Sequence, residues 1–201
     1  MRTLAELIPH LKLGGRRPPL PPLALLTDHT RRVDPLAAAA VLPPGSLVVF
    51  RHYDMPGRAG LAAHLARLCR ARRLVLLVAA DLDLAVRLGA GVHLPEGLAV
   101  AASSRLRLWH RRRGRCLTAA AHGRLALCRA AALGADAALL SPVFPTASHP
   151  GGKTLGPLHF RRLARGAALP VYALGGISGA TLRQLTASGA AGIATVSGLH
   201  R

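Results

Sequence analysis

The chain has 201 residues and a mass of 20.9 kDa, which is enough for one domain with a sizeable core. Hydrophobic residues make up 51% and charged residues 17%, so the composition excludes a disordered chain. No apolar run is long enough to span a bilayer, and the first residues lack the features of a signal peptide. We therefore expect a cytoplasmic protein, in which Cys69, Cys116 and Cys128 are reduced, buried thiols.

The charge is strongly unbalanced, because 27 Lys and Arg residues face 8 acidic ones and give a formal net charge of +19. This excess is compatible with a nucleic-acid-binding protein. It is also what G+C-rich coding DNA produces, since such DNA favours Arg, Ala, Gly and Pro together. The arginines occur as scattered pairs and one triplet, without the interleaved aromatic residues on which bases stack. We therefore expect no specific nucleic-acid partner.

Eight short apolar runs recur along the chain and end in polar or glycine-containing positions. They are continuous rather than alternating, which is typical of parallel strands buried on both faces. The predicted strands lie within residues 23–28, 46–52, 73–81, 91–96, 115–122, 135–144, 170–176 and 192–198.

Segments rich in Ala, Leu and Arg, with helical spacing, separate these strands. The clearest predicted helices are residues 36–42, 57–72, 121–133, 157–167 and 178–188, with Ser178 as an N-cap and Gly134 and Gly189 as C-terminal caps. Repeated strand–helix units predict a compact TIM (β/α)8 barrel over residues 23–201. A doubly wound open sheet is the alternative, but no G-x-G-x-x-G follows the first strand.

The two ends of the predicted barrel are irregular. Only Leu199, His200 and Arg201 follow the eighth strand, so the last helix is predicted to be absent or shortened. We expect residues 1–22 to form an N-terminal extension that packs on the barrel.

Acidic residues gather after the predicted strands, at the barrel end where TIM-barrel sites lie. Five of the 8 acids follow the first four strands: Asp28, Asp54, Asp81, Asp83 and Glu96. A rim of this kind can bind a cation or orient polar groups. Asp is also common in turns and at helix N-caps, and Asp81 and Asp83 could have only that structural role, but the group as a whole favours function.

Two glycine-containing strand ends indicate a phosphate site. Gly175 and Gly176 follow the seventh strand, and Val196, Ser197 and Gly198 end the eighth. TIM-barrel phosphate sites are frequently built from these two loops, because glycine lets backbone N–H groups approach an anion. Tight turns also use glycine, but the occurrence of both loops together favours phosphate binding.

Residues 141–149 form a long Ser/Thr/Pro-rich loop, which is typical of an active-site loop. Thr146 and Ser148 can donate hydroxyl hydrogen bonds to a phosphate, and His149 can add positive charge. After the fifth strand, His122 is well placed to point into the barrel mouth. His93 lies inside an apolar run and is expected to be a hydrogen-bonded core histidine.

Four stretches, taken together and in their order along the chain, resemble the thiamine phosphate synthase family and its TenI-like relatives. In chain order they are DLAVRLGAGVHL at residues 83–94, SPVFPTASHPG at 141–151, ALGGIS at 173–178 and IATVSG at 193–198. The family synthase joins a thiazole phosphate to hydroxymethylpyrimidine diphosphate, and magnesium and basic groups help the diphosphate to leave. The resemblance implies these two small phosphorylated substrates as partners and is compatible with a homo-oligomer.

The resemblance also implies roles for individual residues. Arg51, Thr146 and Ser148 would hold the diphosphate, and His122 stands where the family has a histidine after the fifth strand. The thiazole phosphate would contact the two glycine-containing loops, at Gly175, Gly176, Val196, Ser197 and Gly198. His149 replaces a lysine of the family's loop.

The chain departs from the family at the magnesium ligands. Ala80 stands at the first carboxylate, and the second falls in Gly97-Leu98. Asp81 and Glu96 are the nearest carboxylates, and they could bind magnesium only by replacing the missing ligands. Pro142 stands where TenI-type tautomerases have a histidine.

We therefore expect a divergent thiamine phosphate synthase-like transferase with weak or altered synthase activity. The alternatives are a full synthase with Asp81 and Glu96 as relocated ligands, a non-catalytic phosphate-binding or regulatory module, and a nucleic-acid-binding protein.

Overall fold

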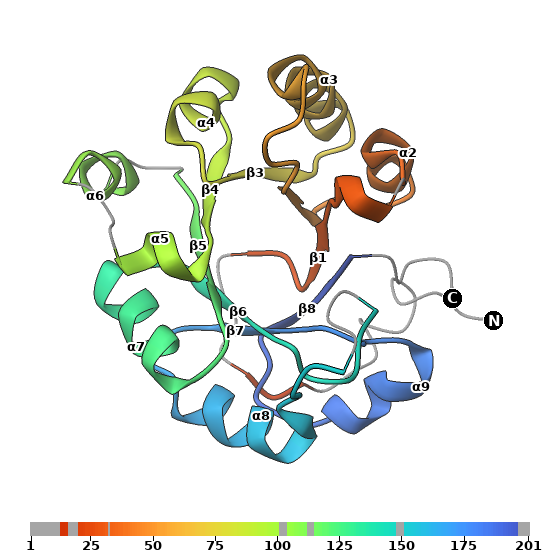
Figure 1. Cartoon of the computed structure of the whole chain (residues 1–201), viewed down its shortest axis with the longest axis vertical. Helices are drawn as coiled ribbons and strands as arrows, with labels where there is room; N and C mark the ends of the chain where they lie inside the picture. Colours follow the sequence, from red (N-terminus) through yellow and green to blue (C-terminus); the bar gives the residue numbers. More distant parts are fainter. Residues whose placement is uncertain are drawn as a thin grey trace.

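Eight parallel strands close into a barrel in which each strand pairs with the next and β8 pairs with β1 (Figure 1). The computed structural model describes residues 13–15, 20–31, 33–100, 104–111, 115–147 and 151–196. The strands are β1 Leu23–Leu26, β2 Leu47–Phe50, β3 Val75–Ala79, β4 Gly91–Leu94, β5 Leu117–Ala121, β6 Ala137–Leu140, β7 Val171–Leu174 and β8 Gly192–Thr195. Each lies within a predicted apolar run, so the predicted TIM barrel is confirmed.

Helices surround the barrel and connect successive strands (Figure 1). They are η2 His29–Arg31, α2 Pro35–Ala40, α3 Arg58–Ala71, α4 Leu82–Leu88, α5 Glu96–Val100, α6 Ser104–His110, α7 Arg124–Leu133, α8 Gly156–Gly166, α9 Gly179–Leu182 and η3 Arg183–Leu185. Helices α3 and α8 begin and end within one residue of their predicted bounds. The predicted helix at 178–188 is instead a short α-helix followed by one 3-10 turn.

The predicted caps are confirmed at two of three positions. The Ser178 side chain accepts a hydrogen bond from Thr181 N at the start of α9, and Gly134 ends α7 with a φ of 81°. Gly189 also has a positive φ of 88°, but it caps no helix. The reason is that Thr186, with a ψ of 132°, has already left helical geometry.

Two layers of apolar side chains hold the barrel together. The interior is filled by alternate strand residues such as Leu26, Val49, Leu77, Leu139 and Tyr172. The other face of each strand packs against the helices in a second, larger cluster. Full burial of such a side chain stabilises the fold by about 1.5–3 kcal/mol. A barrel so filled is closed in its middle, which leaves its ends for function.

Part of the N-terminal extension lies beside the residues that precede β8. Gly189 N donates to Leu13 O at 2.8 Å, and Gly14 forms a bridge with Ala190. A Cβ on Gly15 would lie 2.4 Å from Ala190 O, so only glycine fits there. Residues 1–12, 16–19 and 197–201 lie outside the described residues, so the role of the extension and the missing last helix stay predictions.

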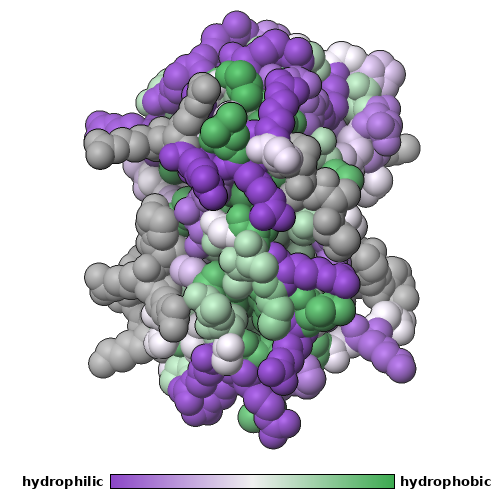
Figure 2. All heavy atoms as spheres, turned by 90° about the vertical axis from the view of Figure 1, so that its left-hand side faces the viewer, coloured by the Kyte–Doolittle hydropathy of each residue, from purple (hydrophilic) through white to green (hydrophobic). Residues whose placement is uncertain are grey.

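The outer surface corrects one expectation. Cys69 is buried, but Cys116 is half-buried and Cys128 is exposed. Cys128 lies on the solvent side of α7, whose Ala126, Leu127 and Ala130 are buried. The face seen in Figure 2 is hydrophobic in its middle and hydrophilic towards its top and bottom. In the described part of the chain, no helix is both long and apolar enough to cross a membrane.

Candidate active site

A cavity of about 470 Å³ opens at the carboxyl end of the barrel. Its volume is in the range of small-molecule sites. The apolar floor is made by Leu26, Leu139, Leu174 and Ala194, which belong to β1, β6, β7 and β8. Polar side chains on the walls come from the segments after the strands: Arg31, Arg51, Tyr53, Glu96, His122, Ser141, Thr146 and Ser178. The cavity is therefore built for a ligand with an apolar body and polar or charged ends.

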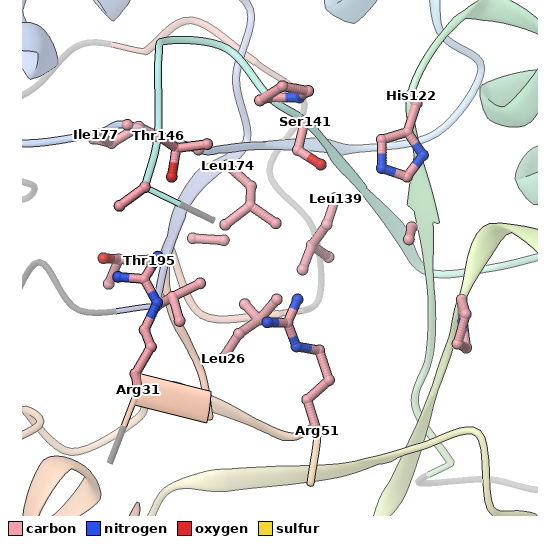
Figure 3. Close-up of a pocket in the computed structure, with 18 of the residues that line it drawn as sticks. Leu26, Arg31, Arg51, His122, Leu139, Ser141, Thr146, Leu174, Ile177 and Thr195 are labelled. Atoms are coloured by element: carbon pink, nitrogen blue, oxygen red, sulfur yellow. The ribbon is translucent and has the colours of Figure 1, made fainter. Parts of the chain in front are cut away.

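Two arginines form one wall and are held by a shared carboxylate. Asp28 Oδ2 lies 2.9 Å from Nη2 of Arg51 and 3.9 Å from Nε of Arg31. Asp28 Oδ1 accepts hydrogen bonds from N and Oγ1 of Thr30. Burial tends to raise the pKa of Asp28, but these hydrogen bonds and the two guanidinium charges outweigh it and lower the pKa. The carboxylate therefore stays ionised and fixes the arginines, whose side chains enter the cavity from the same side (Figure 3).

Glu96 and His122 form a hydrogen-bonded pair on the wall of the cavity. Glu96 is the first residue of α5, His122 follows β5, and Oε2 of the former lies 2.5 Å from Nδ1 of the latter. In Figure 3, His122 lies on the side of the cavity opposite the arginines. Glu96 was predicted as a metal ligand and His122 as a catalytic residue, and the structure brings the two together.

Asp81 lies outside the cavity lining, at the start of α4. Its Oδ1 accepts a hydrogen bond from Leu84 N, and its Oδ2 receives Arg58 Nη1 at 2.6 Å. The same guanidinium donates to Ala79 O and His52 O, and so ties the end of β3 to the end of β2. This is the structural N-cap role that the sequence left open.

Buried His93 lies at the floor of the cavity. Its Nδ1 is 2.8 Å from Thr118 Oγ1, which agrees with the predicted hydrogen-bonded core histidine. Burial, assisted by the charge of Arg51, lowers the pKa of His93 to about 4. The imidazole is therefore neutral at pH 7 and adds no charge to the site.

The glycine-containing loop after β7 lines the cavity through Gly175 and Gly176. Their φ angles are 97° and 64°, and a Cβ on Gly176 would lie 2.3 Å from Pro145 O. The loop is also joined to the one after β6, since Phe144 N donates to Gly175 O at 3.0 Å. These glycines thus allow two loops to pack closely at the same barrel end as the arginines.

The remaining predicted site residues divide into two groups. Thr146 and Val196 line the cavity. Ser148, His149, Ser197 and Gly198 lie outside the described residues. Arg31, Tyr53, Ser141 and Thr195 line the cavity as well, although none of them was predicted as a site residue. The available signal was proximity to a strand end: Thr195 ends β8, Ser141 directly follows β6, and Arg31 and Tyr53 lie in the segments after β1 and β2.

The donor set does not fit a magnesium ion held by protein carboxylates. Ala80 and Gly97-Leu98 offer no side-chain oxygen at the family's ligand positions. The two nearest carboxylates have different partners, because Asp81 pairs with the Arg58 guanidinium and Glu96 is hydrogen-bonded to the His122 imidazole. Among the described residues, no group of three or more His, Cys, Asp or Glu side chains could hold a metal.

Fold and cavity define a TIM-barrel protein with a polar, partly cationic small-molecule site. A family model described as thiamine monophosphate synthase matches residues 25–199. The chain is 34% identical over 174 residues to the thiamine-phosphate synthase of Chromobacterium violaceum, covering 84% of this chain and 81% of the relative. It is 36% identical to a thiamine biosynthesis bifunctional protein of Symbiobacterium thermophilum, of which it spans only 42%.

A solved structure agrees with the fold. The thiamine phosphate pyrophosphorylase from Pyrococcus furiosus superposes with a TM-score of 0.70 at 22% identity, covering 87% of this chain and 85% of that one. The chain belongs to the thiamine monophosphate synthase family.

Proposed function

We propose that this protein binds thiazole phosphate and couples it to hydroxymethylpyrimidine diphosphate, forming thiamine phosphate. In this reaction the bond between the pyrimidine methylene carbon and the diphosphate oxygen breaks, and the electron pair leaves with the diphosphate. The lone pair of the thiazole nitrogen then forms the new carbon–nitrogen bond. Membership of the family and the synthase activity for which its relatives are named support this assignment.

The observation that carries the proposal is the division of one cavity into two polar corners. Arg31 and Arg51 form one corner, after β1 and β2. The loop with Gly175 and Gly176 forms another, after β7. Both corners and the apolar floor belong to the same cavity. A coupling enzyme needs such an arrangement, because two anionic substrates must bind with their rings together.

Each corner has a role in this account. The guanidinium of Arg51 holds the departing diphosphate through charge-assisted hydrogen bonds, and Thr146 supplies a hydroxyl group. The loop at Gly175 and Gly176 holds the phosphate of the thiazole. His122, fixed by Glu96, borders the space between them. We expect Ser148, His149, Ser197 and Gly198 to complete the two corners.

A second candidate is a non-catalytic module that binds the same phosphate ester. The observation that favours it is that both carboxylates predicted as metal ligands already have partners, Asp81 the Arg58 guanidinium and Glu96 the His122 imidazole. Such a module would bind thiazole phosphate saturably but would not form thiamine phosphate. Both candidates are compatible with a homo-oligomer, and the expected lack of a specific nucleic-acid partner remains a prediction.

One experiment separates the two candidates. The purified protein is incubated with both substrates, and thiamine phosphate and released diphosphate are measured by chromatography. Calorimetric titration with thiazole phosphate is run in parallel. Product in proportion to enzyme supports the coupling reaction. Saturable binding without product supports the module, and the absence of both contradicts the two candidates.

A further inference from the structure

We propose that this site binds a diphosphate group without a divalent cation held by the protein, and that Arg31 and Arg51 supply the positive charge instead. The inference rests on the proposed function, because it concerns the diphosphate corner of the same cavity. The inference goes beyond the proposed function because it names the side chains whose charge replaces that of a metal.

The first support is the state of the carboxylates near the cavity. Arg58 Nη1 lies 2.6 Å from Asp81 Oδ2, and both side chains are partly buried. His122 Nδ1 lies 2.5 Å from Glu96 Oε2. A magnesium ion would have to displace the Arg58 guanidinium from Asp81 or the His122 imidazole from Glu96, and the two carboxylates do not belong to one cluster. The protein thus offers magnesium a poor set of ligands.

The second support is the excess of positive charge on the opposite wall. Arg31 and Arg51 both line the cavity, whereas Asp28, which pairs with both, does not. Two guanidinium groups and one carboxylate make up this triad, so the triad brings a net positive charge to the wall of the cavity. Each guanidinium is planar and has five N–H donors, which match the oxygens of a diphosphate.

The third support is the fixed position of these two arginines. Asp28 receives two hydrogen bonds from Thr30, which hold the carboxylate in place. Arg51 is also tied through its backbone, because its N donates to Thr27 Oγ1 at 3.0 Å. The side chains of Arg31 and Arg51 are 22% and 27% exposed, so their charges are screened less than those of free surface arginines. A preorganised pair of this kind neutralises an anion at a small cost in side-chain entropy.

The test is calorimetric titration of the full chain with inorganic pyrophosphate, in EDTA and in magnesium chloride. In the magnesium titration, the concentration of free pyrophosphate is corrected for the fraction that forms a complex with magnesium. We expect the Kd in EDTA to be within about fivefold of the Kd in magnesium. A larger gain with magnesium, or no binding in EDTA, overturns the inference.

Arginine variants test the named residues. Arg31→Gln and Arg51→Gln should each weaken pyrophosphate binding in EDTA by about tenfold. Arg105→Gln is the matched control, because Arg105 also pairs with an aspartate, Asp83, but is exposed on α6 and does not line the cavity. The control should bind pyrophosphate as the unmodified protein does. An equal loss in all three variants would show a general effect of net charge and would overturn the inference.

The outcome also separates this inference from the proposed function. Thermal unfolding of each variant is recorded, so that a folding defect is not mistaken for lost binding. If Arg51→Gln does not fold, pyrophosphate binding by Arg31→Gln alone tests the inference. Formation of thiamine phosphate that requires magnesium would overturn the inference and leave the proposed function standing. Pyrophosphate binding in EDTA, without product from the two substrates, would support the inference and contradict the proposed coupling reaction.

Discussion

Glu96 Oε2 lies 2.5 Å from Nδ1 of His122, and this contact joins the segments that follow β4 and β5. A carboxylate on Nδ1 fixes the imidazole ring and its tautomer. Within the described part of the chain, Nε2 of His122 makes no hydrogen bond. The ring is therefore positioned with one nitrogen available for a ligand.

Replacing Glu96 tests this positioning. Glu96→Ala should lower the rate of coupling by about tenfold or more, because an unsupported imidazole loses its orientation. Glu96→Gln should restore part of the rate, because its amide oxygen can still accept from Nδ1–H. The pair is partly exposed, so the free energy of unfolding should change by less than about 1 kcal/mol. Steady-state kinetics and urea unfolding check both, and equal rates in the two variants would contradict the account.

The loop after β7 should not tolerate a side chain. Gly176→Ala places a Cβ at a φ of 64° and 2.3 Å from Pro145 O, so the loop must move. We expect a loss of about 1–3 kcal/mol in the free energy of unfolding, together with loss of thiazole phosphate binding. Gly60→Ala is the control, because Gly60 is in α3 with open space around it, and that variant should be about 0.5–1 kcal/mol more stable. Unchanged binding in Gly176→Ala would exclude this loop from the site.

The Asp28 carboxylate should make stability depend on acid pH. Its pKa in the folded state is below the ordinary 3.8, so its contribution is present above that value and is lost as the pH falls through the lowered pKa. Asp28→Asn should therefore lower the Tm at pH 7, and the difference from the unmodified protein should narrow below about pH 4. Thermal unfolding across this range measures the difference. A difference in Tm that stays constant with pH would mean that the charge of Asp28 contributes nothing to stability.

The buried His93 should make stability depend on pH over a higher pH range than Asp28 does. Its pKa is about 4 when folded and 6.5 in the ordinary case, so between these values the unfolded chain binds the extra proton. Stability must therefore fall as the pH decreases from about 6.5. From pH 6.5 to 5 the loss should be about 1.6 kcal/mol, and His93→Asn should lack this part of the dependence. Urea unfolding at the two pH values tests it, and equal slopes for both proteins would contradict a buried neutral His93.

The barrel could be predicted because its strands carry a strong local pattern. Continuous runs such as residues 73–81 have only one reading in a small α/β chain, since both faces must be buried. The predicted runs are longer than the strands because they include residues of the following loops, such as Arg51 and His122, and nothing in the local sequence marks where strand pairing ends. The length of helix α9 was overestimated because nothing in the local spacing of apolar residues distinguishes a short helix followed by a 3-10 turn from a longer helix.

The site was predicted where position in the chain determines position in space. Arg51, Glu96, His122 and the loop at Gly175 all follow strands, and each lines the cavity. The partner of each charged group could not be predicted, because it depends on side chains from other strand ends. The N-cap role of Asp81, for example, is completed by Arg58, which is 23 residues away.

The most direct test of the account is the coupling assay in EDTA, with thiazole phosphate and hydroxymethylpyrimidine diphosphate at saturating concentration. The account predicts thiamine phosphate and an equal amount of released diphosphate, both reduced by about tenfold in Arg31→Gln and unchanged in Arg105→Gln. If neither compound forms in EDTA or in magnesium while thiazole phosphate still binds, the protein is not a synthase and the central claim is wrong.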